Sequence, residues 1–264
     1  MKVVLSMTKL IKGGSLEILK GFKDNSIDHT ITSPPYNMNL RVSGDKYISR
    51  QIVKEISTKY DGYDDNLSMD QYYEFTRNIL NELLRVTKQY VFYNVQFLTG
   101  NKKALFKIIG EFNDQIKEII IWDKKHGQPA VGVGVMNSQY EIIIILTKDH
   151  HNSMRRNFVD ANFDKGTLAN LWSINKKRSP MKNHNATFPI ELIEKIIINF
   201  TNKNEIILDP FMGTGTTGVV AINNSRDFIG IELLSKYYDF AENRINDIKR
   251  KCPIEDLLNN LTSK

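Results

Sequence analysis

Cysteine is almost absent from this sequence. Cys252 is the only one among 264 residues. A single thiol forms neither an internal disulfide framework nor a multi-cysteine metal cluster. The composition therefore indicates a reducing compartment, and we expect Cys252 to be chemically inert.

Long hydrophobic runs are also missing. A run such as residues 142–146 is far shorter than the roughly 18 to 20 apolar residues that span a bilayer. The N-terminus has no sustained apolar core followed by a small-residue cleavage site. We expect a cytoplasmic protein without membrane contact.

What is present is an ordinary globular composition with a basic bias. Hydrophobic residues make up 41% and charged residues 25%, with a net charge of +6. Residues 122–184 alone hold ten Lys and Arg against five Asp and Glu. A basic segment of this kind is the electrostatic footprint of a surface that binds nucleic acid, although a solvated lysine-rich surface remains an alternative.

Strand and helix signals alternate along the chain, which predicts an α/β fold with a doubly wound, mostly parallel sheet. We expect strands at 26–32, 89–95, 118–122, 140–147, 205–209 and 227–231, and helices at 68–87, 101–109, 188–200, 216–223 and 234–251. Residues 1–264 form one domain in this interpretation, with a target-recognition insertion at 126–183. The stretch 37–66 lacks apolar periodicity and predicts either a functional loop or a disordered connection.

A glycine-containing turn follows the strand predicted at 205–209. Its residues are Asp209, Pro210, Phe211, Gly213, Gly215 and Thr216. Such a turn at the carboxyl edge of a sheet binds nucleotide-like ligands, although a plain structural connection is the alternative. Glu232, 17 residues after Gly215, ends the next strand, where a carboxylate accepts ribose hydroxyls. Because we count two glycines, we expect a ligand smaller than a nicotinamide dinucleotide, whose loops carry a third, helix-packing glycine.

This turn resembles the first motif of methyltransferases that use S-adenosylmethionine. The resemblance implies that Asp209, Phe211, Gly213 and Gly215 line the methionine and sulfonium end of that cofactor. It also implies that Glu232 holds the ribose.

The most specific string is Ser33-Pro34-Pro35-Tyr36. It resembles the (D/N/S)-P-P-(Y/F) motif of enzymes that methylate exocyclic amino or amide nitrogens. An aryl amino nitrogen is a poor nucleophile until acceptors hold its N–H groups and let it become pyramidal. Prolines donate no N–H, so the Pro34 carbonyl and the Ser33 hydroxyl face the substrate, and Tyr36 offers a ring for stacking a flipped base.

The order of the two motifs in the sequence narrows the choice among methyltransferase families. Ser33 precedes Gly213 by 180 residues, and this permuted order resembles the β-class DNA amino-methyltransferases of restriction-modification systems. Further similar segments are 13–17, 24–28, 121–124 and 182–189. The last segment implies that Phe188 and Pro189 cap the methionine end of the cofactor. Gly14 departs from the pattern, because the family commonly has an aspartate there that contacts adenine.

The resemblance implies methyl transfer from S-adenosylmethionine to cytosine N4 in double-stranded DNA. The alternatives are the same reaction at adenine N6, a silent DNA-binding protein of this fold, or a methyltransferase acting on RNA or protein. Restriction-modification context implies a partner endonuclease, and a homodimer is left open. We expect phosphate contacts from five basic residues: Lys176, Lys177, Arg178, Arg155 and Arg156.

We expect no metal site. His184, His150 and His151 have no Cys or His partner at ligand spacing, which makes surface histidines the better interpretation. The pair Asp64-Asp65 lacks the strand context of a nuclease site.

Overall fold

The computed structural model describes residues 6–37, 42–43, 46–47, 67–128, 133–176 and 188–262. For residues 42–43, 46–47 and 251–262 it describes the backbone alone. Its largest feature is an eight-stranded sheet with the order β1-β10-β9-β2-β5-β7-β6-β8. The strands are β1 (Thr8–Lys12), β2 (Ile27–Thr32), β5 (Thr87–Val95), β6 (Ile116–Gln128), β7 (Ser138–Leu146), β8 (Leu171–Ser173), β9 (Ile206–Asp209) and β10 (Asp227–Glu232). A separate pair joins β3 (Val42–Ser43) and β4 (Lys46–Tyr47).

Within this sheet only β7 runs against the others. It pairs antiparallel with both β5 and β6, whereas the remaining pairs are parallel. Trp122 of β6 lies opposite Glu141 of β7. The mostly parallel sheet predicted from the sequence is confirmed.

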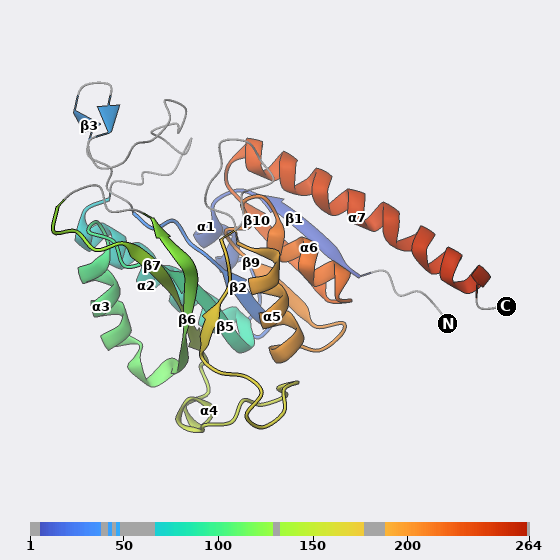
Figure 1. The fold of residues 1–264 in the computed structure, drawn as a ribbon, viewed down its shortest axis with the longest axis horizontal. Coiled ribbons are helices and arrows are strands. Elements are labelled where there is room, and N and C mark those ends of the chain that lie inside the picture. Colours follow the sequence, from blue (N-terminus) through green and yellow to red (C-terminus); the bar gives the residue numbers. More distant parts are fainter. Residues whose placement is uncertain are drawn as a thin grey trace.

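Helices cover both faces of the sheet (Figure 1). They are α1 (Ser15–Lys20), α2 (Met69–Val86), α3 (Lys102–Glu111), α4 (His150–Met154), α5 (Ile190–Phe200), α6 (Thr216–Asn223) and α7 (Ser235–Thr262), with a 3-10 turn η1 (Asn113–Gln115). Helices α1, α2 and α3 pack into one apolar core, and α5, α6 and α7 pack into the other. The fold is therefore doubly wound.

Strand β5 shows why one strand feeds two cores. Tyr90 and Phe92 belong to the core under α5 and α6, whereas Val91, Tyr93 and Val95 belong to the core under α2 and α3. Successive side chains of a strand point to opposite faces, so a strand covered on both sides reads as a continuous apolar run.

Helix α2 begins where the sequence predicts. The Ser68 hydroxyl accepts from the Gln71 backbone N–H, and the Gln71 side chain accepts from the Ser68 backbone N–H. This capping box satisfies two N–H groups that the first turn leaves without partners. Residues Tyr72, Ile79 and Leu83 then bury one face of the helix at helical spacing.

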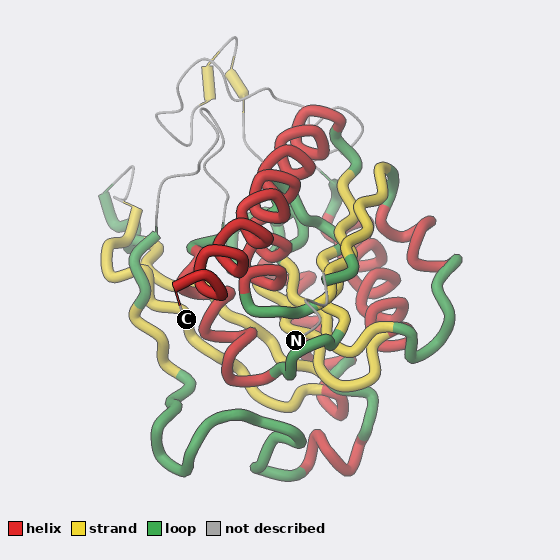
Figure 2. Tube along the Cα trace, turned by 90° about the vertical axis from the view of Figure 1, so that its right-hand side faces the viewer, coloured by secondary structure: helices red, strands yellow, loops and turns green. Residues whose placement is uncertain are grey.

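Helix α7 joins the body through its first half, where Ala241 and Ile245 enter the core. Figure 2, turned by 90°, shows this helix crossing in front of the sheet. Across the described residues, no helix combines the length and apolarity needed to cross a bilayer.

The range 126–183 includes strands that the main sheet shares. Strand β7 sits between β5 and β6, and β8 pairs with β6 at the sheet edge. The part left for recognition is therefore the connections of this range. Its role in recognition stays a prediction.

Candidate active site

Three neighbouring parallel strands end beside one another and bring the two sequence motifs together. Strands β10, β9 and β2 are adjacent in the sheet, and they end at Glu232, Asp209 and Thr32. Because parallel strands end at the same edge, Ser33 emerges next to the glycine turn. Ser33 and Gly213 are 180 positions apart in the sequence, and the adjacency of their strands brings them together.

Asp209 ties the two motifs directly. Its Oδ1 accepts from Thr32 Oγ1 at 2.8 Å and from the Phe211 backbone N–H at 3.1 Å, and its Oδ2 accepts from Thr217 Oγ1 at 2.6 Å. Only 2% of the residue is exposed. Burial raises the pKa of Asp209 to about 6, with a further contribution from the charge of Glu232, despite these hydrogen bonds.

The glycine turn adopts conformations that favour glycine. Gly213 has φ +50° and Gly215, which precedes α6, has φ +77°. A Cβ at Gly215 would lie 2.9 Å from Ala241 Cβ, whereas at Gly213 the nearest heavy atom would be 4.0 Å away. Gly215 is therefore packed against α7, and Gly213 leaves its backbone open to a ligand.

A third glycine follows one turn into α6. A Cβ at Gly218 would lie 2.5 Å from Phe228 Cε1, so this glycine lets α6 pack closely on β10. Gly213, Gly215 and Gly218 have the spacing of dinucleotide loops. The count of two glycines is therefore incomplete, because the packing glycine is present as Gly218, and the glycine spacing does not by itself argue for a ligand smaller than a dinucleotide.

Glu232 faces the same turn. Its Oε2 accepts from the Gly213 N–H and its Oε1 from the Leu234 N–H, both at 2.9 Å. The residue is 9% exposed, and burial raises its pKa. Each carboxylate oxygen has a second lone pair, so this side chain fits the paired hydroxyls of a ribose.

Two further segments close around the turn. The Gly13 N–H donates to the Glu232 carbonyl at 3.0 Å, and the Ser15 hydroxyl donates to the Pro210 carbonyl. On the other side, Arg244 Nη1 donates to the Thr214 carbonyl at 2.7 Å. Sequence reasoning missed Arg244, since one arginine in a helix of alternating charges carries no distinctive signal.

The proline turn is held by its outer carbonyls. The Pro35 carbonyl accepts from Tyr72 Oη at 3.1 Å, and the Tyr36 carbonyl accepts from Asn101 Nδ2 at 2.6 Å. Among the described residues none donates to the Pro34 carbonyl. That carbonyl is therefore available to a substrate N–H, as the motif predicts.

The Tyr36 hydroxyl joins a buried polar network. It lies 2.8 Å from Ser33 Oγ, donates to Glu141 Oε2 at 2.9 Å and accepts from Asn94 Nδ2 at 2.5 Å. Lys124 Nζ pairs with Glu141 Oε1 at 3.2 Å, and these two residues are 6% and 7% exposed. Burial and the charge of Glu141 raise the pKa of Tyr36 well above its usual value.

Sequence reasoning missed Asn94, Lys124 and Glu141, although a period of two contains the signal. In each of four strands, two apolar or aromatic residues at alternate positions lie on one face, and the next alternate position, at the carboxyl edge of the sheet, is polar. The rows are His29, Ile31 and Ser33; Tyr90, Phe92 and Asn94; Ile120, Trp122 and Lys124; and, in reversed direction, Ile145, Ile143 and Glu141.

Three other predicted residues reach this edge. Phe188 and Pro189 immediately precede α5, which begins at the carboxyl edge because its C-terminal end bonds to Arg226 at the start of β10. Lys176 follows β8, which runs parallel to β6 and so ends at the same edge. Lys177 and Arg178 lie outside the described residues.

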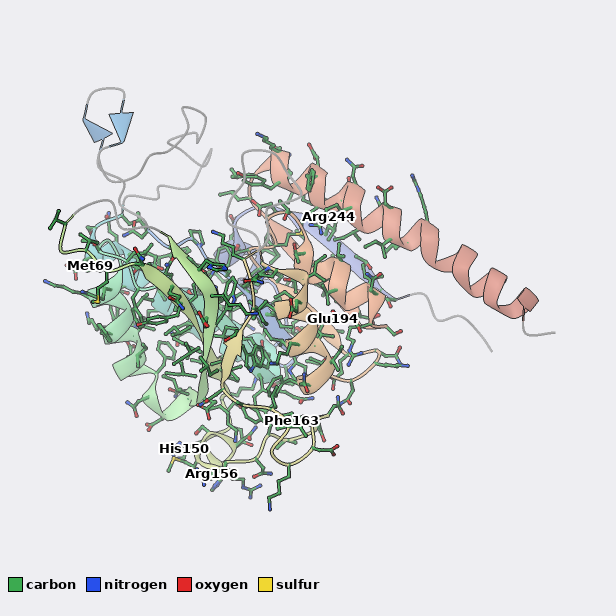
Figure 3. All side chains as sticks on the ribbon, viewed as in Figure 1. Met69, His150, Arg156, Phe163, Glu194 and Arg244 are labelled. Carbon is green, nitrogen blue, oxygen red and sulfur yellow. The ribbon has the colours of Figure 1, made fainter. Side chains whose placement is uncertain are left out.

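Arg155 and Arg156 lie elsewhere. Lys117 Nζ, at the start of β6, donates to the Arg155 carbonyl at 2.5 Å, which places both arginines at the amino edge. Figure 3 shows Arg156 with His150 at the bottom of the molecule, far from Arg244 beside the glycine turn. The structure therefore does not bring this pair together with the catalytic turn.

No cluster of metal-binding side chains occurs in the part of the chain that the structure describes. His150 and His151 are exposed on α4. His184 and Asp64-Asp65 lie outside the described residues.

Comparison with known proteins identifies relatives of this arrangement. The family model N6_N4_Mtase, described as DNA methylase, matches residues 27–243. Type II methyltransferase M.HinfI of Haemophilus influenzae is 27% identical over 262 residues, covering 92% of this chain and 69% of its own. M.HpaI of Haemophilus parainfluenzae is 27% identical over 261 residues, covering 90% of this chain and 74% of its own.

Solved structures share the fold. The PvuII DNA methyltransferase, described as cytosine-N4-specific, superposes with a TM-score of 0.67 at 20% identity and covers 94% of this chain and 93% of that one. The complex of M1.HpyAVI with SAM superposes with a TM-score of 0.61 at 23% identity and covers 91% of this chain and 100% of that one.

Proposed function

The chain belongs to the DNA methylase family, and from this premise we propose that it transfers a methyl group from S-adenosylmethionine to cytosine N4 in double-stranded DNA. Family membership makes it a DNA amino-methyltransferase, acting on cytosine N4 or adenine N6. The choice of cytosine, the cofactor contacts and the residue roles below are our proposals.

One contact carries the assignment of roles. The 2.8 Å hydrogen bond from Thr32 to Asp209 joins the residue before the proline turn to the residue that opens the glycine turn. A base held at the proline turn and a ligand held at the glycine turn are therefore neighbours. Transfer between two bound groups requires this proximity.

The residues present fit S-adenosylmethionine. Glu232 offers acceptors for the ribose, Gly213 leaves open space beside its backbone, and Phe188 and Pro189 immediately precede α5 at the same edge. Bound there, the cofactor supplies a methyl group on a positively charged sulfur. Asp209 supports the turn from below, because its carboxylate accepts hydrogen bonds from Thr32, Thr217 and Phe211.

The proline turn positions the base. The Pro34 carbonyl and Ser33 Oγ accept the two amino hydrogens, and the Tyr36 ring stacks on the flipped base. Held in this way, the nitrogen directs its lone pair to the methyl carbon. The nitrogen supplies the electrons of the new bond, the broken bond leaves its pair on sulfur, and one amino proton is lost to solvent.

Two observations support cytosine. The turn begins with serine, and within the family S-P-P-Y leans to cytosine whereas D-P-P-Y leans to adenine. The PvuII enzyme, described as cytosine-N4-specific, has the same fold. Adenine N6 is the alternative outcome of the test below.

We further propose that DNA approaches the carboxyl edge, where Lys176 follows β8. Lys177 and Arg178 are the next two residues in the sequence. We also propose that the enzyme acts in the cytoplasm. Its partner would be an endonuclease that recognises the same DNA site, as the Type II names of its relatives suggest. Arg155 and Arg156 lie outside this surface.

Radiolabelled methyl transfer tests the proposal. Duplex DNA, RNA and total protein are each incubated with the protein and labelled S-adenosylmethionine, and we expect label in duplex DNA alone. Hydrolysis of that DNA to nucleosides should give N4-methyl-2′-deoxycytidine. Label in the adenine nucleoside would overturn the choice of base, and no label in DNA would overturn the function.

A further inference from the structure

We propose that Glu141, paired with Lys124, fixes the direction of a hydrogen-bond chain through Tyr36 that turns Ser33 into an acceptor for the target amino group. Glu141 is then a positioning residue, because it acts through Tyr36 and does not touch the base. This inference rests on the proposed function and extends it to a residue that the motifs do not contain.

The donors around Glu141 define its state. Lys124 Nζ approaches Oε1 at 3.2 Å, while Asn94 Nδ2 at 2.8 Å and Tyr36 Oη at 2.9 Å both approach Oε2. All three neighbouring groups donate to Glu141. This arrangement fits an ionised carboxylate, which has no hydrogen to give and only accepts. The ammonium group of Lys124 compensates its charge in a buried place.

Tyr36 has a single hydrogen to give. Its raised pKa keeps the phenol protonated, and a hydrogen bond to a charged acceptor is about twice as strong as one to a neutral acceptor. The phenolic hydrogen therefore goes to Glu141. Asn94 Nδ2, at 2.5 Å, donates into one side of the phenolic oxygen.

The hydroxyl of Ser33 then has one orientation to take. It lies 2.8 Å from Tyr36 Oη, whose own hydrogen is committed to Glu141, so Ser33 donates to Tyr36. One lone pair of Ser33 Oγ faces Asn94 Nδ2 at 3.5 Å, and the other is left for the substrate. A serine hydroxyl donates or accepts by rotation, and the chain from Glu141 selects acceptance. An aspartate at this position would need no such help.

Glu141→Gln reverses the chain while keeping its shape. A glutamine amide that donates to Tyr36 Oη turns the phenolic hydrogen toward Ser33, which turns the serine hydrogen toward the amino group. We expect kcat to fall about 10- to 100-fold, the value of one hydrogen bond to a charge-polarised group. The dissociation constant of S-adenosylmethionine should stay within twofold.

A double-mutant cycle separates this role from support of the fold. Tyr36→Phe removes the hydroxyl that links Glu141 to Ser33 and leaves the amide of Asn94, which contacts both side chains, in place. In that background Glu141→Gln should change kcat by less than about twofold. Equal losses with and without the Tyr36 hydroxyl would overturn the proposal, since a structural defect does not depend on that oxygen.

Two companions keep the test decisive. Lys124→Met combined with Glu141→Gln removes the unpaired buried ammonium, and it should fold with the melting temperature of the wild type and keep the low kcat of Glu141→Gln. Glu118→Gln, a half-buried carboxylate on β6 at the amino edge, should keep full activity. Wild-type activity on DNA with no loss in Glu141→Gln refutes this inference alone, whereas an inactive wild type refutes the proposed function.

Discussion

At the scale of the residue, Asp209 gives the fold a pH dependence of known sign. Its pKa is about 6 in the folded protein and about 3.9 in an unfolded chain. Between these values the folded state binds more protons than the unfolded state, so stability falls as the pH rises. The ionised, buried carboxylate then costs up to about 3 kcal/mol.

Asp209→Asn removes this titration. We expect the free energy of unfolding of the variant, measured by urea denaturation, to gain on the wild type by up to about 3 kcal/mol between pH 4 and pH 6.5. A difference between the two proteins that does not change with pH would mean that Asp209 titrates normally.

Glu232 is the residue on which we expect cofactor affinity to depend most. Glu232→Ala removes the acceptors that we propose for the ribose and also the hydrogen bonds from the Gly213 and Leu234 N–H groups. The dissociation constant of S-adenosylmethionine should rise by the equivalent of about 1.5 to 3 kcal/mol in calorimetry. Asp227→Ala, at the opposite end of the same strand, is the matched control and should bind normally.

Sequence reasoning named candidate site residues inside the motifs and missed those between them, although the alternation along the strands carried a signal for the missed ones. Ser33 and Asp209 stand in strings whose chemistry dictates their types. Glu141 precedes a run of isoleucines, and its partner Lys124 lies 17 residues earlier. Only the pairing of β6 with β7 makes them neighbours, and the sequence pattern alone did not show that pairing.

At the scale of the element, α6 and α3 offer a matched pair of glycines. Gly218→Ala would place a Cβ 2.5 Å from Phe228 Cε1 and 2.8 Å from Ile245 Cδ1. Overpacking of this kind costs about 1 to 3 kcal/mol. Gly110→Ala meets no atom within 4 Å and should stabilise α3 by about 0.4 to 1 kcal/mol.

Thermal unfolding of the two variants measures the difference. We expect the melting temperature to fall for Gly218→Ala and to rise for Gly110→Ala. Similar melting temperatures would show that α6 shifts away from β10 at little cost.

Two of the long amphipathic or fully apolar helices were predictable with both ends, whereas the helix predicted at 234–251 begins within one residue of α7 but stops short of its end at Thr262. The helix predicted at 216–223 matches α6, and the helix predicted at 68–87 matches α2 within one residue at each end. Strands β1 and β8 were missed because five and three residues at sheet edges carry too little apolar pattern. Tertiary pairing, not local propensity, forms these strands.

At the scale of the molecule, we expect substitutions at the two edges of the sheet to have different effects on the salt dependence of DNA binding. Replacing Lys176, Lys177 and Arg178 by alanine should weaken the binding of cognate and noncognate DNA duplexes alike. The slope of log affinity against log salt should flatten by about 0.9 for each phosphate that the variant no longer neutralises.

The pair Arg155→Ala and Arg156→Ala is the control at the amino edge. Fluorescence anisotropy across a salt series should give the wild-type slope for this double variant. The reverse result, a changed slope here and an unchanged slope for the triple variant, would move the DNA surface to the amino edge.

The buried pair of Lys124 and Glu141 also has a consequence for how β6 and β7 align. Residues Ile142 to Leu146 are buried on both faces, so a slip by one residue would exchange one isoleucine for another at little cost in hydrophobic burial. The same slip would carry Glu141 to the opposite face from Lys124 and leave two unpaired charges in the interior. Strand β7 does not alternate apolar and polar residues over Ile142–Leu146, so its register against β6 is fixed by the carboxylate of Glu141 at the end of this run.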